Sequence, residues 1–177
     1  MHLGRVLSDN KSGGPPFVMS PNEFGLILLV EDSEDDAFLM NRALGAAGVK
    51  SRLHLARDGQ EAKDYLSGAG PFSDRQEFPL PGFVFLDLKL PYFSGFDVLE
   101  WMAKKTELSS IFVAVLTSSE EPQDIKTSYR LGARTFLVKP PSGSMIQDVA
   151  RAFDIDVKAL GAGIRSAARS CPTIAIA

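Results

Sequence analysis

The 177-residue sequence has little cysteine, no long apolar run and no marked excess of charge. Its single cysteine, Cys171, has no second thiol in the chain with which to form a disulfide, so a reducing cytoplasm is the expected location. The formal net charge of −3 argues against a nucleic-acid-binding surface as the main function. No apolar stretch approaches the ~18 residues that a membrane span requires, so no membrane insertion is expected.

The composition fits one domain with a proper core, since 45% of the residues are hydrophobic. Residues 1–22 contain glycine, proline and serine without periodicity, which indicates a flexible N-terminal tail. Residues 161–177 are rich in alanine, glycine and serine and are interpreted as a frayed C-terminal tail. The folded domain is therefore predicted to span residues 23–160.

Five apolar segments alternate with five amphipathic segments along this domain. The expected strands are 26–31, 52–56, 83–88, 111–116 and 135–138. The expected helices are 34–47, 59–68, 95–106, 121–132 and 142–160, and a Pro/Gly-rich loop is expected at 69–82. Phe96, Leu99 and Ala103 are predicted to share one face of the third helix. The alternation predicts an α/β fold with a five-stranded parallel sheet of order 2-1-3-4-5, doubly wound and flavodoxin-like.

Polar residues follow several of the apolar strands directly. Glu31 and Asp32 end the first expected strand, Asp87 ends the third, Thr117 follows the fourth and Lys139 follows the fifth. The carboxyl ends of parallel strands meet at one edge of the sheet, so these side chains are expected to converge. Two charges ~4 Å apart repel by ~4 kcal/mol at an effective dielectric near 20. Three clustered carboxylates therefore predict a hard divalent cation, for which Mg²⁺ is the simplest candidate and Mn²⁺ an alternative.

Three further acids, Glu34, Asp35 and Asp36, open the first expected helix. Ser33 is a good N-cap, and an acid three residues later completes an S-x-x-[DE] capping pattern. Negative charge in a first helical turn is also favoured by the helix dipole, by ~0.3–1 kcal/mol for each acid. These three residues are therefore interpreted as helix-initiating acids and not as part of the site.

Four separated segments, "VED", "FLDLKLPYFSGFDVL", "VAVLTSS" and "LGARTFLVKP", resemble the receiver domain of two-component response regulators. The resemblance covers roughly residues 25–157 in the correct order and spacing. It implies that Asp87 is the phosphoacceptor. It also implies that Asp32 is a direct Mg²⁺ ligand, that Glu31 acts through a water, and that the backbone carbonyl of Lys89 completes the protein ligands.

The resemblance assigns the remaining site residues as well. Thr117 corresponds to the hydroxyl that contacts the phosphoryl group, and Lys139 to the lysine that pairs with it. Phe136 lies at the aromatic switch position, where it is expected to act together with Thr117. The Lys139–Pro140 peptide resembles the cis bond of the family.

The function implied is that of a signalling protein and not of an enzyme beyond its own phosphoryl transfer. The donor is expected to be a sensor histidine kinase or a phosphotransfer protein. Only 38 residues follow Lys139, so a stand-alone receiver is expected. Its motifs and its long loop at 69–82 are similar to receivers that partner bacterial phytochrome kinases. In such proteins the surface made by the fourth helix, the fifth strand and the fifth helix often forms a homodimer.

Three alternatives belong to other functional classes. A haloacid-dehalogenase-type phosphohydrolase with an aspartyl nucleophile requires a D-x-D pair, but Lys89 occupies the second position. A flavodoxin-like FMN site requires an anion-friendly first loop, where Glu31 and Asp32 would repel a phosphate. A phosphorylation-independent pseudo-receiver, which only binds partners, stays open. The complete set of acids, hydroxyl and lysine favours an active receiver.

Overall fold

The computed structural model describes residues 25–118 and 121–161, with side chains described as far as Phe153. The strands are β1 (Leu26–Val30), β2 (Arg52–Ala56), β3 (Phe83–Asp87), β4 (Phe112–Thr117) and β5 (Thr135–Val138). The α-helices are α1 (Glu34–Ala46), α2 (Gly59–Ser67), α3 (Gly95–Ala103), α4 (Pro122–Arg130) and α5 (Gly143–Gly161). Two 3₁₀ turns, η1 (Gly70–Phe72) and η2 (Thr106–Leu108), interrupt the connections before β3 and β4.

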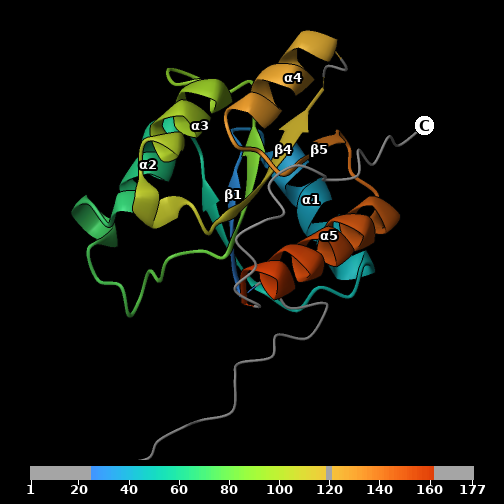
Figure 1. Ribbon diagram of the computed structural model, residues 1–177, viewed down its shortest axis with the longest axis horizontal. Helices are drawn as coiled ribbons and strands as arrows, with labels where there is room; N and C mark the ends of the chain where they lie inside the picture. The colour runs from blue at the N-terminus through green and yellow to red at the C-terminus, as the bar shows by residue number, and fades with distance from the viewer. Residues whose placement is uncertain (1–24, 119–120, 162–177) are drawn as a thin grey trace, which may run out of the picture.

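The five strands form one parallel sheet of order β2-β1-β3-β4-β5, which confirms the predicted topology. Alternate side chains of each strand point to opposite faces, so the apolar strands contribute to two separate cores. Leu28 and Val30 pack on the side of α2 and α3, while Ile27 and Leu29 pack on the side of α1 and α5. The two pairs of helices lie on opposite sides of the sheet (Figure 1).

The tails predicted at 1–22 and 161–177 lie outside the described residues, apart from Gly161 at the end of α5. Within the described ranges, no helix has both the length and the apolar character needed to cross a bilayer.

Helix α3 differs from the expectation in its length and in its buried face. It ends at Ala103 and not at 106, and a 3₁₀ turn follows. Its buried side chains are Val98, Leu99 and Met102, whereas Phe96 is partly buried and Ala103 is exposed. The predicted face was therefore wrong at Ala103, because the i, i+1, i+4 stripe around Leu99 is the one that meets the sheet and α2.

The segment 69–82 carries more structure than a plain loop. Its Phe72 and Phe78 pack edge-on against His54 of β2, with ring centroids 5.6 and 6.0 Å away. Arg75 donates hydrogen bonds to the backbone oxygens of Tyr65 and Leu66, at 2.8 Å each, and so satisfies the carboxyl end of α2. The segment therefore forms a small aromatic core over the outer strand of the sheet.

Candidate functional site

The acidic residues predicted to converge do meet at the carboxyl edge of the sheet. Glu31 follows β1 directly, Asp32 follows Glu31, and Asp87 is the last residue of β3. Carboxylate oxygens of the three residues all lie within 4.8 Å of one another. Glu31 and Asp87 are only 1% and 3% exposed, while Asp32 is exposed to solvent. Two of the three charges are thus largely removed from water and need compensation.

Lys139 at the end of β5 supplies part of that compensation. Its Nζ lies 2.7 Å from Asp87 Oδ2 and contacts Glu31 Oε2 as well. Burial alone lowers the pKa of Lys139, but its hydrogen bonds to these carboxylates outweigh burial and raise the pKa above 10.5. Burial raises the pKa of Glu31, and Lys139 only partly reverses that effect. The single positive charge of Lys139 therefore cannot neutralise both Glu31 and Asp87.

The hydrogen bonds at the site leave room for a metal ion. Asp87 Oδ1 accepts from the backbone N–H of Lys89 at 3.0 Å, and Glu31 Oε1 accepts from that of Ser33 at 3.2 Å. The buried Oε2 of Glu31 forms an ion pair with the Lys139 ammonium. Three carboxylates whose oxygens lie within 4.8 Å of one another, with only one ammonium between two of them, are a donor set that fits a hard divalent cation.

The hydroxyl and aromatic residues of the prediction flank this cluster. Thr117 is the last residue of β4 and is 2% exposed, and its backbone oxygen accepts from Lys139 N at 2.9 Å. Phe136 of β5 is half-buried, and its ring meets that of Tyr129 from α4 edge-on at 6.4 Å. The Lys139–Pro140 peptide bond is cis.

The loop after β3 approaches the end of that strand so closely that one position requires glycine. A Cβ placed on Gly95 would lie 2.2 Å from the backbone oxygen of Asp87 and 2.8 Å from Cα of Leu88. Gly95 N donates to the backbone oxygen of Leu88 at 3.0 Å, which closes the loop. In the same loop Tyr92 has a φ of 64° with its side chain 95% exposed. Because Gly95 has no side chain, the loop can pack directly against the backbone of Asp87 without displacing it.

Asp36 is a residue of the site that the sequence interpretation missed. Its Oδ2 lies 3.0 Å from Lys139 Nζ, although 103 positions separate the two residues. Ser33 Oγ caps the helix by accepting from Asp36 N at 3.2 Å, but the carboxylate makes no return bond to Ser33 N. The capping pattern explains the hydrogen bond of the Asp36 backbone to Ser33 and not the contact of its carboxylate with Lys139. No local sequence signal distinguishes an acid that only caps a helix from one that also reaches a distant lysine.

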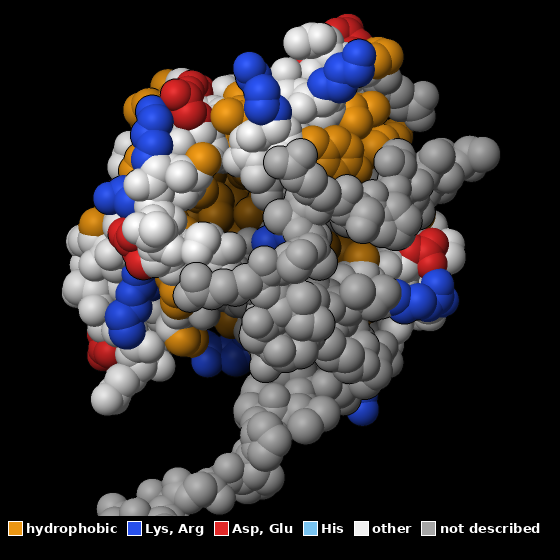
Figure 2. Space-filling model, in the orientation of Figure 1, with side chains coloured by type: hydrophobic (Ala, Val, Ile, Leu, Met, Phe, Trp, Pro, Cys, Tyr) orange, Lys and Arg blue, Asp and Glu red, His pale blue; other side chains and the backbone are white. Residues whose placement is uncertain are grey.

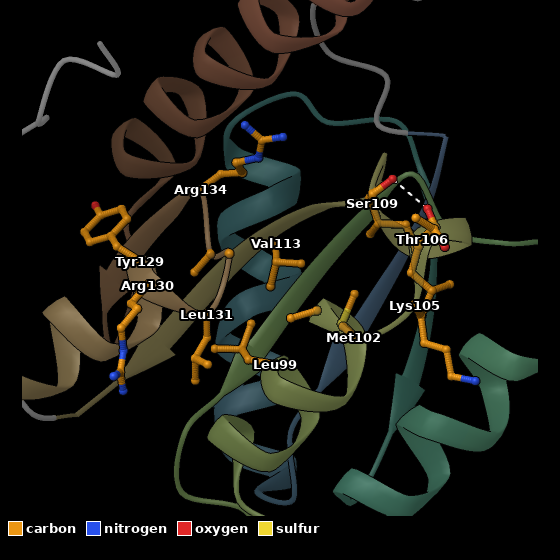
Figure 3. A pocket seen from close by; sticks show the side chains of 15 residues that line it. Leu99, Met102, Lys105, Thr106, Ser109, Val113, Tyr129, Arg130, Leu131 and Arg134 are labelled. Carbon is orange, nitrogen blue, oxygen red and sulfur yellow. Dashed lines mark hydrogen bonds between the residues drawn. The ribbon is translucent and has the colours of Figure 1, made fainter. Parts of the chain in front are cut away.

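A hollow in the described surface lies away from this cluster. It measures about 510 Å³ and lies between α3, η2 and the last turn of α4, with hydrophobic side chains on its floor (Figure 2). Leu99 and Met102 of α3 and Val113 of β4 point into it, and Leu131 borders it (Figure 3). None of the residues that line it belongs to the acidic cluster, so the hollow and the cluster are separate features of the molecule.

Comparisons with known proteins agree with this geometry. The family model described as "Response regulator receiver domain" matches residues 27–151. A curated relative, the probable methanogenesis regulatory protein FilR2 of Methanothrix harundinacea, is 38% identical over 120 residues, which are 66% of this chain and 73% of that protein. The bacteriophytochrome response regulator AtBRR has a solved structure with a TM-score of 0.66 and 38% identity, covering 73% of this chain and 92% of its own.

A third relative carries a metal ion. Response regulator Rcp1 of Synechocystis sp. is 35% identical over 114 residues, which are 64% of this chain and 76% of that protein. The crystal structure of its Mn²⁺-bound form has a TM-score of 0.60 at 28% identity, covering 84% of this chain and 99% of its own. The family model spans most of the chain, including the whole acidic cluster and all five strands apart from Leu26 at the start of β1. The chain therefore belongs to the response regulator receiver domain family.

Proposed function

We propose that the chain accepts a phosphoryl group on Asp87 from a histidine kinase or phosphotransfer protein. The position of the Asp87 carboxylate carries this proposal. It is buried at the end of a central strand, with one oxygen on Lys139 Nζ and the other on the backbone N–H of Lys89. A carboxylate held in this way is a fixed nucleophile whose charge is partly offset.

The chemistry that follows is a displacement at phosphorus. An Asp87 oxygen forms the new O–P bond while the P–N bond of a donor phosphohistidine breaks, and the histidine nitrogen leaves with the bonding pair and takes a proton from solvent. Phosphoryl transfer depends mainly on positioning and charge stabilisation. Lys139 supplies a fixed positive charge beside the acceptor, and the Thr117 hydroxyl supplies a hydrogen bond to a phosphoryl oxygen.

The proposed metal is Mg²⁺, with Mn²⁺ as a substitute. Asp32 and Asp87 would be direct ligands, Glu31 would act through a water, and the Lys89 carbonyl would complete the protein ligands. When bound, the ion would neutralise charge on the carboxylates and orient phosphoryl oxygens. The clustered carboxylate oxygens of Glu31, Asp32 and Asp87 support this assignment.

The proposed output surface is the face formed by α4, β5 and α5, through which two copies would form a homodimer. Thr117 and Phe136 would act as a coupled switch, in which the hydroxyl turns toward the phosphoryl group and the Phe136 ring fills the space it leaves. The support is that Phe136 is half-buried and already contacts Tyr129, which is 40% exposed on α4. Phosphorylation should therefore change dimer affinity, and Phe136→Ala should accept phosphate normally while losing that change.

The proposed donor is a kinase of the bacterial phytochrome type, because AtBRR is described as a bacteriophytochrome response regulator. The test is phosphotransfer from purified phosphorylated kinases, one of the phytochrome type and one of another type, each with Mg²⁺ and with EDTA. Fast Mg²⁺-dependent transfer from the phytochrome-type kinase supports the proposal. Transfer that is equally slow from every donor, with or without Mg²⁺, would support a pseudo-receiver instead.

A further inference from the structure

Lys139 contacts three carboxylates that come from three different places in the fold. Its Nζ lies 2.7 Å from Asp87 and 3.0 Å from Asp36, and it also contacts Glu31. The lysine side chain is only 8% exposed, so its ammonium is compensated by these carboxylates more than by water. Two of the three, Asp87 and Glu31, also belong to the group whose oxygens lie close enough to share a metal ion. Asp36 is outside that group.

Glu31 and Asp87 could therefore pair either with the Lys139 ammonium or with a bound metal ion. In the metal-free chain Lys139 offsets the charge of Asp87 and Glu31. If a divalent ion were bound by the cluster, it would offset the charge of these carboxylates, and the Lys139 ammonium would then have a positive neighbour. Lys139 still needs a carboxylate partner, because an unpaired ammonium in a largely buried position is costly. Among the described carboxylates that pair with Lys139, Asp36 is the one outside the group that could hold a metal ion.

The local structure leaves the Asp36 carboxylate available for this task. Ser33 N, the donor that a reciprocal capping box would direct to Asp36, instead donates to Glu31 Oε1 at 3.2 Å. Glu34, in the same turn, pairs with Arg57 at 3.1 Å on the exposed side. Asp36 thus directs its charge to the end of β5 and not to its own helix.

We propose that Asp36 is a positioning residue that holds Lys139 and so favours metal binding at Glu31, Asp32 and Asp87. With Asp36 present, the ammonium has a partner when it gives up the shared carboxylates. Without Asp36, Lys139 depends wholly on Glu31 and Asp87 and competes more strongly with the metal. The inference deepens the proposed function, because it concerns the regulation of the same metal site.

The test compares Asp36→Asn with Asp35→Asn by titrating the purified full chain with Mg²⁺ in a calorimeter. Asp35 is exposed in the same helical turn, so its substitution removes the same unit charge from the same helix end. The control therefore accounts for loss of long-range attraction and of helix-dipole stabilisation. The Asp36 side chain is 37% exposed, so solvent screens its ion pair with Lys139 and limits its worth to about 1 kcal/mol. Asp36→Asn should therefore raise the Mg²⁺ Kd about three- to fivefold more than Asp35→Asn.

The same pair of substitutions in a Lys139→Met background decides whether Asp36 acts through the lysine. If it does, the difference between Asp36→Asn and Asp35→Asn disappears in that background, which is the signature of a coupled pair. In the presence of Lys139, Asp36→Glu should restore most of the affinity. The proposal is overturned if the two asparagine variants have equal affinities, or if their difference persists without Lys139.

These titrations require no phosphorylation, so their outcome separates the inference from the proposed function. A chain that shows the Asp36–Lys139 coupling but accepts no phosphate would keep the positioning role and lose the phosphoacceptor assignment. A chain that accepts phosphate but shows no coupling would lose only the positioning role. Absence of Mg²⁺ binding by the unsubstituted chain would overturn the metal site and the inference together.

Discussion

Replacing Lys139 with methionine tests the charge balance of the site most severely. Methionine keeps much of the length of the side chain but removes the ammonium that contacts Glu31 and Asp87, which are 1% and 3% exposed. Removing one partner of a buried ion pair costs ~3–5 kcal/mol, because the remaining charge is left uncompensated. Since 1 kcal/mol shifts Tm by ~2–4 °C at this chain length, we expect Tm to fall by roughly 6–20 °C in EDTA.

The loss of stability in Lys139→Met should depend on Mg²⁺ and on pH. An added divalent ion replaces the missing positive charge, so Mg²⁺ should stabilise Lys139→Met more than it stabilises the unsubstituted chain. Without Mg²⁺, the pKa of Glu31, already raised by burial, should rise further in the variant. A carboxyl whose pKa is raised on folding stabilises the fold at low pH and loses that contribution as pH rises. The variant should therefore regain stability as the pH is lowered toward 4.5, the ordinary pKa of a glutamate, and should do so more than the unsubstituted chain.

The assay is thermal and urea unfolding of both proteins with EDTA and with saturating Mg²⁺. Lys104→Met is the matched control, because Lys104 Nζ lies 3.0 Å from Glu100 Oε1 in an exposed i, i+4 pair on α3. That substitution should cost no more than about 0.5 kcal/mol and should not respond to Mg²⁺. A loss below about 1 kcal/mol for Lys139→Met, or an equal loss with and without Mg²⁺, would refute the reasoning.

Three further predictions concern the loop after β3 and the histidine beneath the segment 69–82. Gly95→Ala should destabilise the fold by about 2 kcal/mol or more and slow phosphorylation, because the added Cβ would lie 2.2 Å from the backbone oxygen of Asp87. Gly45→Ala is the control, since a Cβ there has no neighbour within 4 Å, and urea unfolding should show it to be neutral or stabilising. Burial lowers the pKa of His54 below 6.5, although Glu61 opposes this effect. The unfolded chain therefore binds more protons, and the free energy of unfolding should fall as the pH drops through 6.5. In His54→Phe, the denaturation midpoint should not show this dependence on pH. Tyr92→Gly should gain about 0.5–1 kcal/mol by relieving its φ of 64°, whereas Tyr92→Ala should not, and equal stability of both would contradict the strain.

The sheet and most of the site could be predicted from the sequence because their signals are local. Apolar runs mark the strands, and a parallel sheet brings the ends of those strands to one edge, where Glu31 and Asp87 meet. The contact between Asp36 and Lys139 could not be predicted in this way. The capping pattern around Ser33 already explained an acid at position 36, while the direction of its carboxylate is set by a β5 residue 103 positions away.

The segment 69–82 shows the same limit of local reasoning. Its proline and glycine content predicts a loop, and most of it has no helix or strand. The packing of Phe72 and Phe78 on His54 depends on which strand lies beneath the segment, and so only the sheet order reveals it. Helix α3 is a related case, because the choice between Ala103 and Met102 as a buried residue depends on how the helix is rotated against the sheet and α2.

Mapping of the phosphorylated residue tests the central claim most directly. The chain would be incubated with acetyl phosphate and Mg²⁺, treated with borohydride to reduce any aspartyl phosphate to homoserine, and digested for mass spectrometry. Modification at Asp87, absent with EDTA and absent in a folded Asp87→Asn variant, is the predicted result. Modification at a different residue, or equal phosphate incorporation by Asp87→Asn, would contradict the assignment of Asp87 as the phosphoacceptor.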